Sequence, residues 1–160
     1  MRIAKIKPND IANGEGVVVS VFVQGCPHHC KGCFNKETWD FNGGREFNCE
    51  DYTTILDMLD ADGIKRNLSI LGGEPMARQN VIGVLSLINF IKSNRPDTKV
   101  YLWSGYTYEQ IQEMYGEDVL KDFVDVLIDG QFILEEKDLT LKLRGSSNQR
   151  IINISKKIPF

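Results

Sequence analysis

Hydrophobic residues follow two alternating patterns along the chain. Short, nearly all-apolar runs rich in β-branched residues are typical of parallel strands buried on both faces. Longer stretches place apolar residues three or four positions apart, as amphipathic helices do. The predicted strands are residues 17–23, 68–71, 99–103 and 124–128, with a further candidate at 139–143. The predicted helices are residues 49–62, 77–93 and a third that starts at Thr107 and ends at Gly116.

Capping residues define the predicted ends of these helices. Thr107 and Gln110 match a capping box, in which each side chain accepts a backbone N–H of the other residue. Gly63 and Gly116 follow two of the helices, where glycine is common because it readily adopts a left-handed conformation. Pro96 limits the middle helix, since the residue before a proline disfavours the helical conformation.

Strands that alternate with helices predict an α/β fold with mostly parallel strands and right-handed crossovers. No internal repeat and no linker rich in Pro, Gly or Ser interrupts residues 1–160, which predicts one domain. A complete eight-stranded barrel needs about 250 residues. We therefore expect an open, partial (β/α) barrel, with its chemistry at the carboxyl ends of the strands.

The composition is that of an ordinary globular protein. Of its 160 residues, 42% are hydrophobic and 26% are charged, which excludes a disordered or collagen-like chain. Four cysteines are too few for a disulfide scaffold, so we expect reduced, metal-bound or catalytic thiols. The longest apolar run, residues 17–23, is too short to cross a bilayer, and the first residues lack the apolar part of a signal peptide. These features predict a cytoplasmic protein without a membrane partner.

The net charge of −3 is unevenly distributed. Residues 139–160 carry +5 and no acidic side chain, which leaves −8 on residues 1–138. The acidic body argues against a nucleic-acid partner. The basic segment suits either an acidic partner or an anionic cofactor, or else it is a solvated edge strand and terminus. Its basic residues are Lys142, Arg144, Arg150, Lys156 and Lys157.

Three cysteines lie within eight residues, directly after the first predicted strand. They are Cys26, Cys30 and Cys33. A loop can fold three thiolates around one metal centre, whereas a strand would point them to opposite faces. A closed zinc site takes four ligands, and a complete iron–sulfur cluster usually takes four thiolates. Three thiolates on a 4Fe–4S cluster would leave one iron open to a substrate.

Other interpretations of this loop remain open. His28 or His29 would complete a Cys3His zinc site and make the protein a non-catalytic zinc-binding module. Cys30 and Cys33 have the spacing of a thioredoxin-type pair, but that interpretation leaves the first cysteine unused. The histidines are otherwise loop residues or hydrogen-bond donors to a cluster. Cys49, at a predicted helix start, is expected to be a structural thiol.

A second unusual segment, Gly72-Gly73-Glu74-Pro75, follows the next predicted strand. Taken alone, it indicates only a turn. The carboxyl ends of neighbouring parallel strands lie at the same edge of a sheet, so we expect this segment to face the cysteine loop.

This combination resembles the radical S-adenosylmethionine (SAM) superfamily, and most closely the anaerobic ribonucleotide reductase activating proteins. The segments that carry the resemblance span most of the chain and are residues 13–16, 25–35, 38–39, 72–75, 103–106, 129–130 and 144–149. Two positions depart from the pattern. Glu15 stands where proline is expected, and Gly32 stands where the superfamily often has an aromatic residue. Phe34 would take the place of that ring beside the adenine.

The resemblance implies a single radical SAM domain with a shortened partial barrel, one 4Fe–4S cluster and SAM. Cys26, Cys30 and Cys33 would hold the cluster, whose open iron would be chelated by the amino and carboxylate groups of SAM. Reductive cleavage would give methionine and a 5′-deoxyadenosyl radical, which removes a hydrogen from a glycine of the large reductase subunit. The implied partners are this glycine-containing loop and an electron donor such as a flavodoxin or ferredoxin. The expected cofactor-binding residues are Gly32, Cys33, Phe34, Gly72, Gly73, Glu74 and Asp129.

Individual roles follow from the same resemblance. The two glycines would let the backbone approach the methionyl group, and Glu74 would accept a hydrogen bond from its ammonium. Asp129 would accept from the ribose hydroxyls, bind the methionyl end through a cation, or cap a loop. Arg144 and Arg150 would steady the SAM carboxylate or the partner. Three nearby aromatic residues are expected to pack rather than bind, namely Trp39, Trp103 and Tyr106.

The small size of the chain favours a large substrate that enters the site from outside. With few strands to enclose a pocket, the open side of a partial barrel would admit a loop of another protein. The alternative within the same class is a small-molecule radical SAM enzyme, of the type that rearranges pterins to deazapurines.

Overall fold

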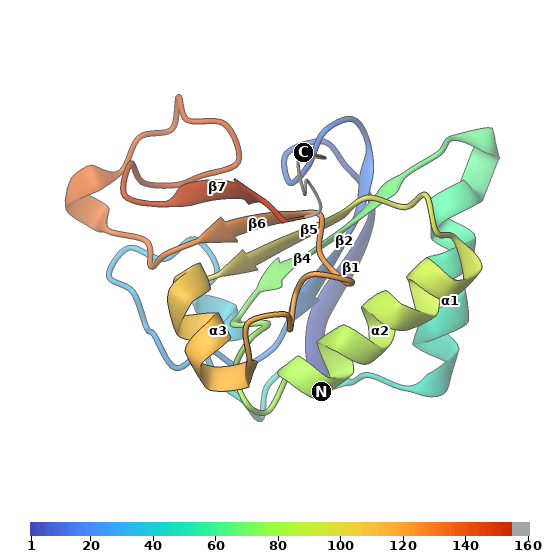
Figure 1. The fold of residues 1–160 in the computed structure, drawn as a ribbon, viewed down its shortest axis with the longest axis horizontal. Helices are drawn as coiled ribbons and strands as arrows, with labels where there is room; N and C mark the ends of the chain where they lie inside the picture. Colours follow the sequence, from blue (N-terminus) through green and yellow to red (C-terminus); the bar gives the residue numbers. More distant parts are fainter. Residues whose placement is uncertain (155–160) are drawn as a thin grey trace.

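A computed structural model describes residues 1–154 as a seven-stranded sheet with three α-helices (Figure 1). The strands are β1 (Arg2–Asp10), β2 (Val18–Val23), β3 (Arg45–Glu46), β4 (Asn67–Gly72), β5 (Val100–Ser104), β6 (Val126–Asp129) and β7 (Arg150–Asn153). The helices are α1 (Cys49–Asp60), α2 (Val81–Asn94) and α3 (Tyr108–Tyr115), with short 3-10 turns at Lys36–Thr38, Ala61–Gly63 and Leu134–Glu136. No helix among these residues is long and apolar enough to cross a membrane.

The sheet is mixed, with the strand order β3-β1-β2-β4-β5-β6-β7. Strands β2, β4, β5 and β6 are parallel to one another, while β1, β3 and β7 pair antiparallel with their neighbours. The α/β class is confirmed, and the sheet is mixed, with four parallel strands at its centre and antiparallel pairs at both sides that were not predicted. The parallel part is the buried centre, and antiparallel strands with more polar sequences flank it on both sides.

Strand β1 was not predicted because its pattern is irregular and contains Pro8. Proline lacks the N–H that a central strand donates to its neighbour. Strand β3 pairs only with Arg2 and Ile3, so the outer side of β1 beside Pro8 has no partner strand to receive such a bond.

Most predicted elements are present, with shifted ends. Helix α1 begins at Cys49 as predicted, and the capping box of Thr107 and Gln110 at the start of α3 is confirmed. Helix α2 starts at Val81 rather than at residue 77, because residues 77–80 form turns.

The predicted strand at residues 139–143 is wrong. The alternating leucines there, Leu139, Leu141 and Leu143, line a cavity in a loop, and the strand that pairs with β6 is β7. Alternating apolar residues are expected both in a half-buried strand and in an extended cavity wall, so the pattern alone does not separate the two.

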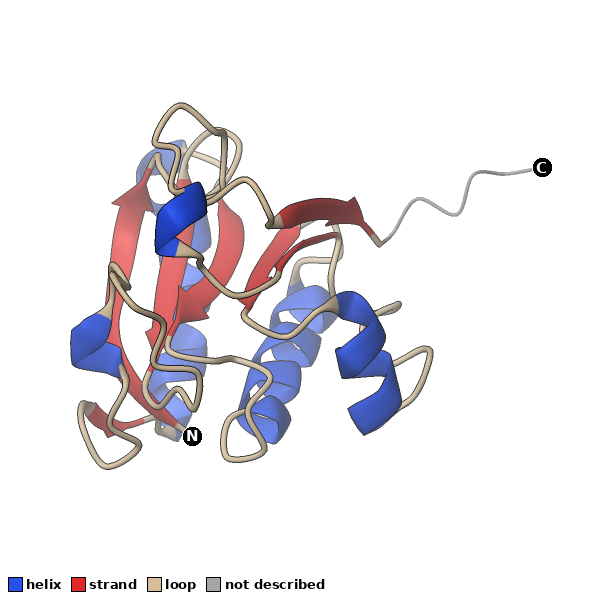
Figure 2. Cartoon of the chain, turned by 90° about the vertical axis from the view of Figure 1, so that its left-hand side faces the viewer, coloured by secondary structure: helices blue, strands red, loops and turns tan. Residues whose placement is uncertain are grey.

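The helices pack on one face of the sheet (Figure 1). Val19, Val21 and Val23 of β2 share one buried core with the inner residues of all three helices. The alternate residues Ser20 and Phe22 point to the opposite face, as successive strand side chains do. Among residues 1–154, no α-helix covers that face. Figure 2 looks onto the carboxyl ends of the central strands, where long loops lie in front of the sheet.

Candidate functional site

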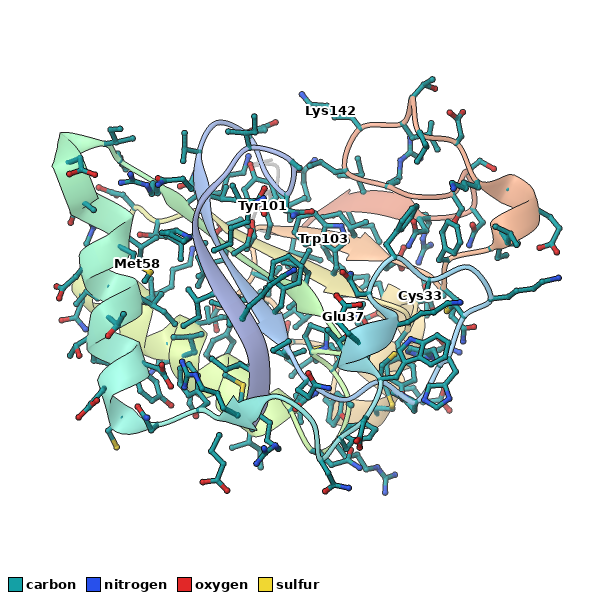
Figure 3. The ribbon with its side chains drawn as sticks, turned by 180° about the vertical axis from the view of Figure 1, so that it is seen from behind. Cys33, Glu37, Met58, Tyr101, Trp103 and Lys142 are labelled. Atoms are coloured by element: carbon teal, nitrogen blue, oxygen red, sulfur yellow. The ribbon has the colours of Figure 1, made fainter. Side chains whose placement is uncertain are left out.

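A cavity of about 470 Å³ lies at the carboxyl ends of the central strands, on the helix-free face. Phe22, Leu71 and Trp103 form its apolar floor, and three loops provide its walls. These walls are residues 12–13, the cysteine loop at 26–35, and a long strap at 130–149, each contributing some of its side chains. Figure 3 shows Cys33 beside Trp103 on this side of the molecule, with Lys142 on the strap. The two segments that the sequence singled out therefore meet at one cavity.

All three cysteines of the loop line this cavity. Cys26 is buried, and Cys30 and Cys33 are half-buried. Burial raises the pKa of the Cys26 thiol to about 11, because a thiolate is poorly solvated there, and burial also raises the pKa of Cys30. The thiols of Cys26 and Cys30 are therefore protonated at neutral pH in the absence of a metal, and binding a metal as thiolates releases their protons.

Gly32 has a structural reason to be glycine. Its φ of +77° is in the left-handed region, and a Cβ there would lie 2.8 Å from Cδ1 of Leu134 in the strap. An aromatic residue at this position would therefore be strained and would push the strap away. Phe34 is 55% exposed and lines the cavity, and its ring packs on Phe132 of the strap with centroids 5.1 Å apart.

Neither histidine is placed as a fourth metal ligand. His29 stacks on Trp39 with ring centroids 4.6 Å apart, and Nε2 of His28 contacts Glu74 instead. Within residues 1–154, no three His, Cys, Asp or Glu side chains converge as a single metal ion would require. His28 and Glu74 also line the cavity but are bound to each other, which leaves three thiols as the available donors. This set fits a cluster with one open position better than a closed zinc site.

Glu74 is fully buried and is the most connected polar group of the site. Its Oε1 accepts hydrogen bonds from the backbone N of Met76 at 2.9 Å and from Oγ of Ser104 at 2.7 Å. Its Oε2 accepts from the backbone N of Gly105 at 2.6 Å and contacts Nε2 of His28 at 2.8 Å. A carboxylate offers about four lone-pair sites, so the protein itself already occupies them all. The sequence had suggested Glu74 only as an acceptor for an ammonium.

His28 links the cysteine loop to the other walls of the cavity. Because Glu74 only accepts, the His28 Nε2 atom carries the proton, and Nδ1 is free to accept from Nε2 of Gln131 at 3.1 Å. The imidazole also packs edge-on against the ring of Tyr106. His28 is thus committed to Glu74 and the strap, so it does not act as a donor to a cluster in this structure.

The glycine pair forms the joint between the two loops. Backbone N of Gly73 donates to the carbonyl of Val23 at 2.9 Å, and backbone N of Glu74 donates to the carbonyl of Gly25 at 2.8 Å. A Cβ on Gly73 would lie 2.5 Å from the Gly25 carbonyl oxygen, so a side chain there would force the two loops apart. Gly72 and Gly73 also line the cavity, where they were expected.

Asp129 lies outside the cavity lining, contrary to the expectation of a direct cofactor contact. Its buried carboxylate accepts from backbone N of Tyr108 at 2.7 Å, and from Nε and Nη2 of Arg150 at 3.0 and 2.5 Å. Arg150 also pairs with Glu109 and lies outside the lining as well. These contacts raise the pKa of Arg150, and the guanidinium lowers the pKa of Glu109 to about 2. Of the three roles considered for Asp129, the geometry favours the loop cap.

Arg144 does line the cavity. Its Nη1 donates to the carbonyl of Gln149 at 3.1 Å, while its Nε is buried with no hydrogen-bond partner among the residues described. A guanidinium held in this way at the cavity wall can donate hydrogen bonds to a carboxylate bound in the cavity. Trp103 also lines the cavity, and its Nε1 donates to the carbonyl of Leu143, so it supports the strap as a packing residue would.

Some predicted residues do not reach the site. Cys49, expected to be a structural thiol, is exposed at the first turn of α1 and lies outside the cavity lining. Lys156 and Lys157 lie outside the described residues, so the predicted basic segment is described only in part. Other lining residues were missed, including Lys5, Asn13 and Gln131. They come from β1 and from loops whose positions depend on the packing of distant elements.

Comparisons with known proteins identify the family of this chain. Residues 12–152 match a family model described as a 4Fe-4S single cluster domain. An anaerobic ribonucleoside-triphosphate reductase-activating protein of Vibrio cholerae is 40% identical over 145 residues, which cover 90% of this chain and 92% of that protein. The proteins of the same name from Escherichia coli K12 and phage T4 are 39% and 38% identical, covering 89% and 94% of this chain and 92% and 93% of theirs. The chain therefore belongs to the family of anaerobic ribonucleoside-triphosphate reductase-activating proteins.

Proposed function

We propose that this protein reductively cleaves SAM at a 4Fe–4S cluster held by Cys26, Cys30 and Cys33, and thereby installs a glycyl radical on anaerobic ribonucleotide reductase. One observation carries the proposal. Three thiols with no fourth ligand line the same cavity as the Gly-Gly-Glu segment. A cluster held there by three thiolates would keep one iron free to bind a cofactor in the same cavity.

When bound, the cluster supplies one electron to the sulfonium of SAM, because iron–sulfur potentials extend down to about −700 mV. The protein's own residues bind and orient. The cysteine loop buries Cys26, and Phe34 with Phe132 offers an apolar surface for the adenine beside Cys33. Gly32, the other expected contact in this loop, lies outside the cavity lining.

The methionyl group is proposed to lie along Gly72 and Gly73, with its carboxylate toward Arg144. Because the acceptor sites of Glu74 are occupied, its carboxylate contributes chiefly by holding this segment in place. Asp129 is proposed to act without touching the cofactor. Its contacts fix the end of β6 and the start of α3.

The fold is proposed to be a shortened, open (β/α) barrel. Strands β2, β4, β5 and β6 follow one another in a single direction across the sheet, and the helices that connect them share one face. This is the winding of a barrel rather than of a sheet covered on both faces. Exposed apolar side chains near the cavity, Phe34 and Leu139, suit a polypeptide substrate such as the glycine-containing loop of the reductase. A flavodoxin or ferredoxin is the proposed electron donor.

Anaerobic reconstitution with iron and sulfide tests the cofactor part of the proposal. We expect about four irons per chain, and cleavage of SAM to methionine and 5′-deoxyadenosine with a strong chemical reductant. Cys30→Ala should lose the cluster, while Cys49→Ala, the matched control outside the cavity, should keep it. A colourless protein with tightly bound zinc and no SAM cleavage would contradict the proposal and favour the zinc-binding module.

A further inference from the structure

Asn80 occupies a helix N-cap position without capping the helix. It directly precedes α2 and is 1% exposed. Asparagine at this position usually accepts a hydrogen bond from a backbone N–H of the first helical turn. The side chain of Asn80 makes no such bond, so its conformation serves a different contact.

The Asn80 amide instead bridges the two loops of the candidate site. Its Nδ2 donates to the carbonyl of Gln24 at 3.1 Å, to that of Gly25 at 3.4 Å and to that of Glu74 at 3.0 Å. The first two carbonyls belong to the residues directly before Cys26, and the third belongs to the Gly-Gly-Glu segment. One buried side chain therefore contacts both the two residues that directly precede the cysteine loop and the Gly-Gly-Glu segment.

These contacts add to a joint that is otherwise made by backbone hydrogen bonds and by the contact of His28 with Glu74. The carbonyl of Gly25 accepts from backbone N of Glu74, and the backbone of Gly73 packs too closely for a Cβ. Without Asn80, the carbonyls of Gln24 and Glu74 would lose a buried donor, and the remaining joint would have fewer bonds to hold its spacing.

We propose that Asn80 is a positioning residue that fixes the cysteine loop against the Gly-Gly-Glu loop, and so sets where SAM lies relative to the cluster. This inference rests on the proposed function. Reactions between two bound groups depend strongly on their separation, and a displacement of about 1 Å can cost on the order of 100-fold in rate. A side chain that touches neither the cluster nor SAM would then control both cofactor affinity and cleavage.

The test compares Asn80→Asp and Asn80→Ala with Asn67→Ala. Asp has the size of Asn but presents carboxylate oxygens to the three carbonyls, while Ala only removes the donor. Asn67 is the matched control, because its Oδ1 accepts from backbone N of Lys99 at 3.0 Å near the amino ends of β4 and β5, away from the cavity lining.

Two measurements are made on each protein. Hydrogen exchange on the metal-free chain should be faster at residues 24–26 and 73–76 in both Asn80 variants and unchanged there in Asn67→Ala. On the reconstituted proteins, iron content should be retained, SAM affinity should fall about tenfold or more, and SAM cleavage should fall further. Asn80→Asp should be the more severe of the two.

Two results would overturn the inference. One is faster exchange throughout the chain with no excess at the two loops, which would indicate general destabilisation. The other is an Asn80→Asp protein with the SAM affinity and cleavage rate of the unmodified chain. If the unmodified reconstituted protein neither binds nor cleaves SAM, the proposed function fails, and the positioning role fails with it. Failure of the Asn80 variants alone to differ from the unmodified protein would refute only the positioning role.

Discussion

At the scale of single residues, the buried carboxylate of Glu74 is the strongest constraint on the site. Four groups of the protein surround it, and three of them are hydrogen-bond donors fixed in the backbone or at a strand end. Replacing an acceptor oxygen by an amide NH2 turns one of these contacts into a donor facing a donor. A buried polar group left without a partner costs about 1–3 kcal/mol.

We therefore expect Glu74→Gln to lower the free energy of unfolding of the metal-free protein by about 2 kcal/mol. Urea unfolding followed by circular dichroism measures this change. Glu37→Gln is the control, because Glu37 is exposed in the turn at Lys36–Thr38, and it should change stability by less than about 0.5 kcal/mol. Equal stability of the two variants would show that the hydrogen bonds around Glu74 do not hold the loops.

The sequence identified some site residues and missed others for a physical reason. Cys26, Cys30 and Cys33 were found because their spacing within one loop is itself the signal. Asn80 and the contact of His28 with Glu74 connect residues 46 to 56 positions apart, and no local pattern records such contacts. The expected role of Glu74 was incomplete because the number of donors around a carboxylate depends on the folded structure.

At the scale of elements, β7 is held to the sheet by charge as well as by backbone pairing. Arg150, its first residue, contacts the buried Asp129 of β6 and the exposed Glu109 of α3. Removing the guanidinium leaves a buried carboxylate with only the backbone N of Tyr108 as a donor among these contacts.

Arg150→Ala should accordingly lower the free energy of unfolding by about 1–3 kcal/mol, the cost of a buried group that loses a charged partner. Arg95→Ala is a suitable comparison, because Arg95 pairs with the exposed Asp60, and exposed ion pairs contribute less than about 1 kcal/mol. Chemical denaturation of both variants distinguishes the two cases. A larger loss for Arg95→Ala would contradict the importance of the contact between β7 and β6.

Elements with strong local signals were predicted well, and elements that depend on their neighbours were not. The β-branched run of β2 and the capping box of α3 specify their structures locally. Strands β1 and β7 carry mixed sequences and exist as strands because β2 and β6 offer them an edge. The same reason explains why the leucines at 139–143 form a cavity wall instead.

At the scale of the whole molecule, the two faces of the sheet differ in what they contact. Helices cover one face (Figure 1) and build the core, and the cavity lies on the other face. Exposed apolar residues occur on both sides. Ile11, 79% exposed, precedes the cavity wall at residues 12–13, whereas Ile82, 78% exposed, lies on α2.

If the reductase docks over the cavity, Ile11→Asp should weaken its binding about tenfold, since an anchor side chain that is buried on binding contributes 1 kcal/mol or more. Cleavage of SAM without the reductase should be unchanged. Ile82→Asp, equally exposed on the helical face, should bind the reductase normally. Calorimetry measures the affinity for the reductase. If only Ile82→Asp lowers this affinity, the docking surface lies on the helices.

The proposed function requires that a radical formed in the cavity removes a hydrogen atom from a glycine of the reductase. Its most direct measurement is electron spin resonance of the reduced, reconstituted protein incubated anaerobically with SAM and the large reductase subunit. We predict a glycyl radical doublet that requires both SAM and the reductase and is absent with the Cys30→Ala protein. SAM cleavage without any doublet, across a range of reductase concentrations, would contradict the account and favour a small-molecule substrate.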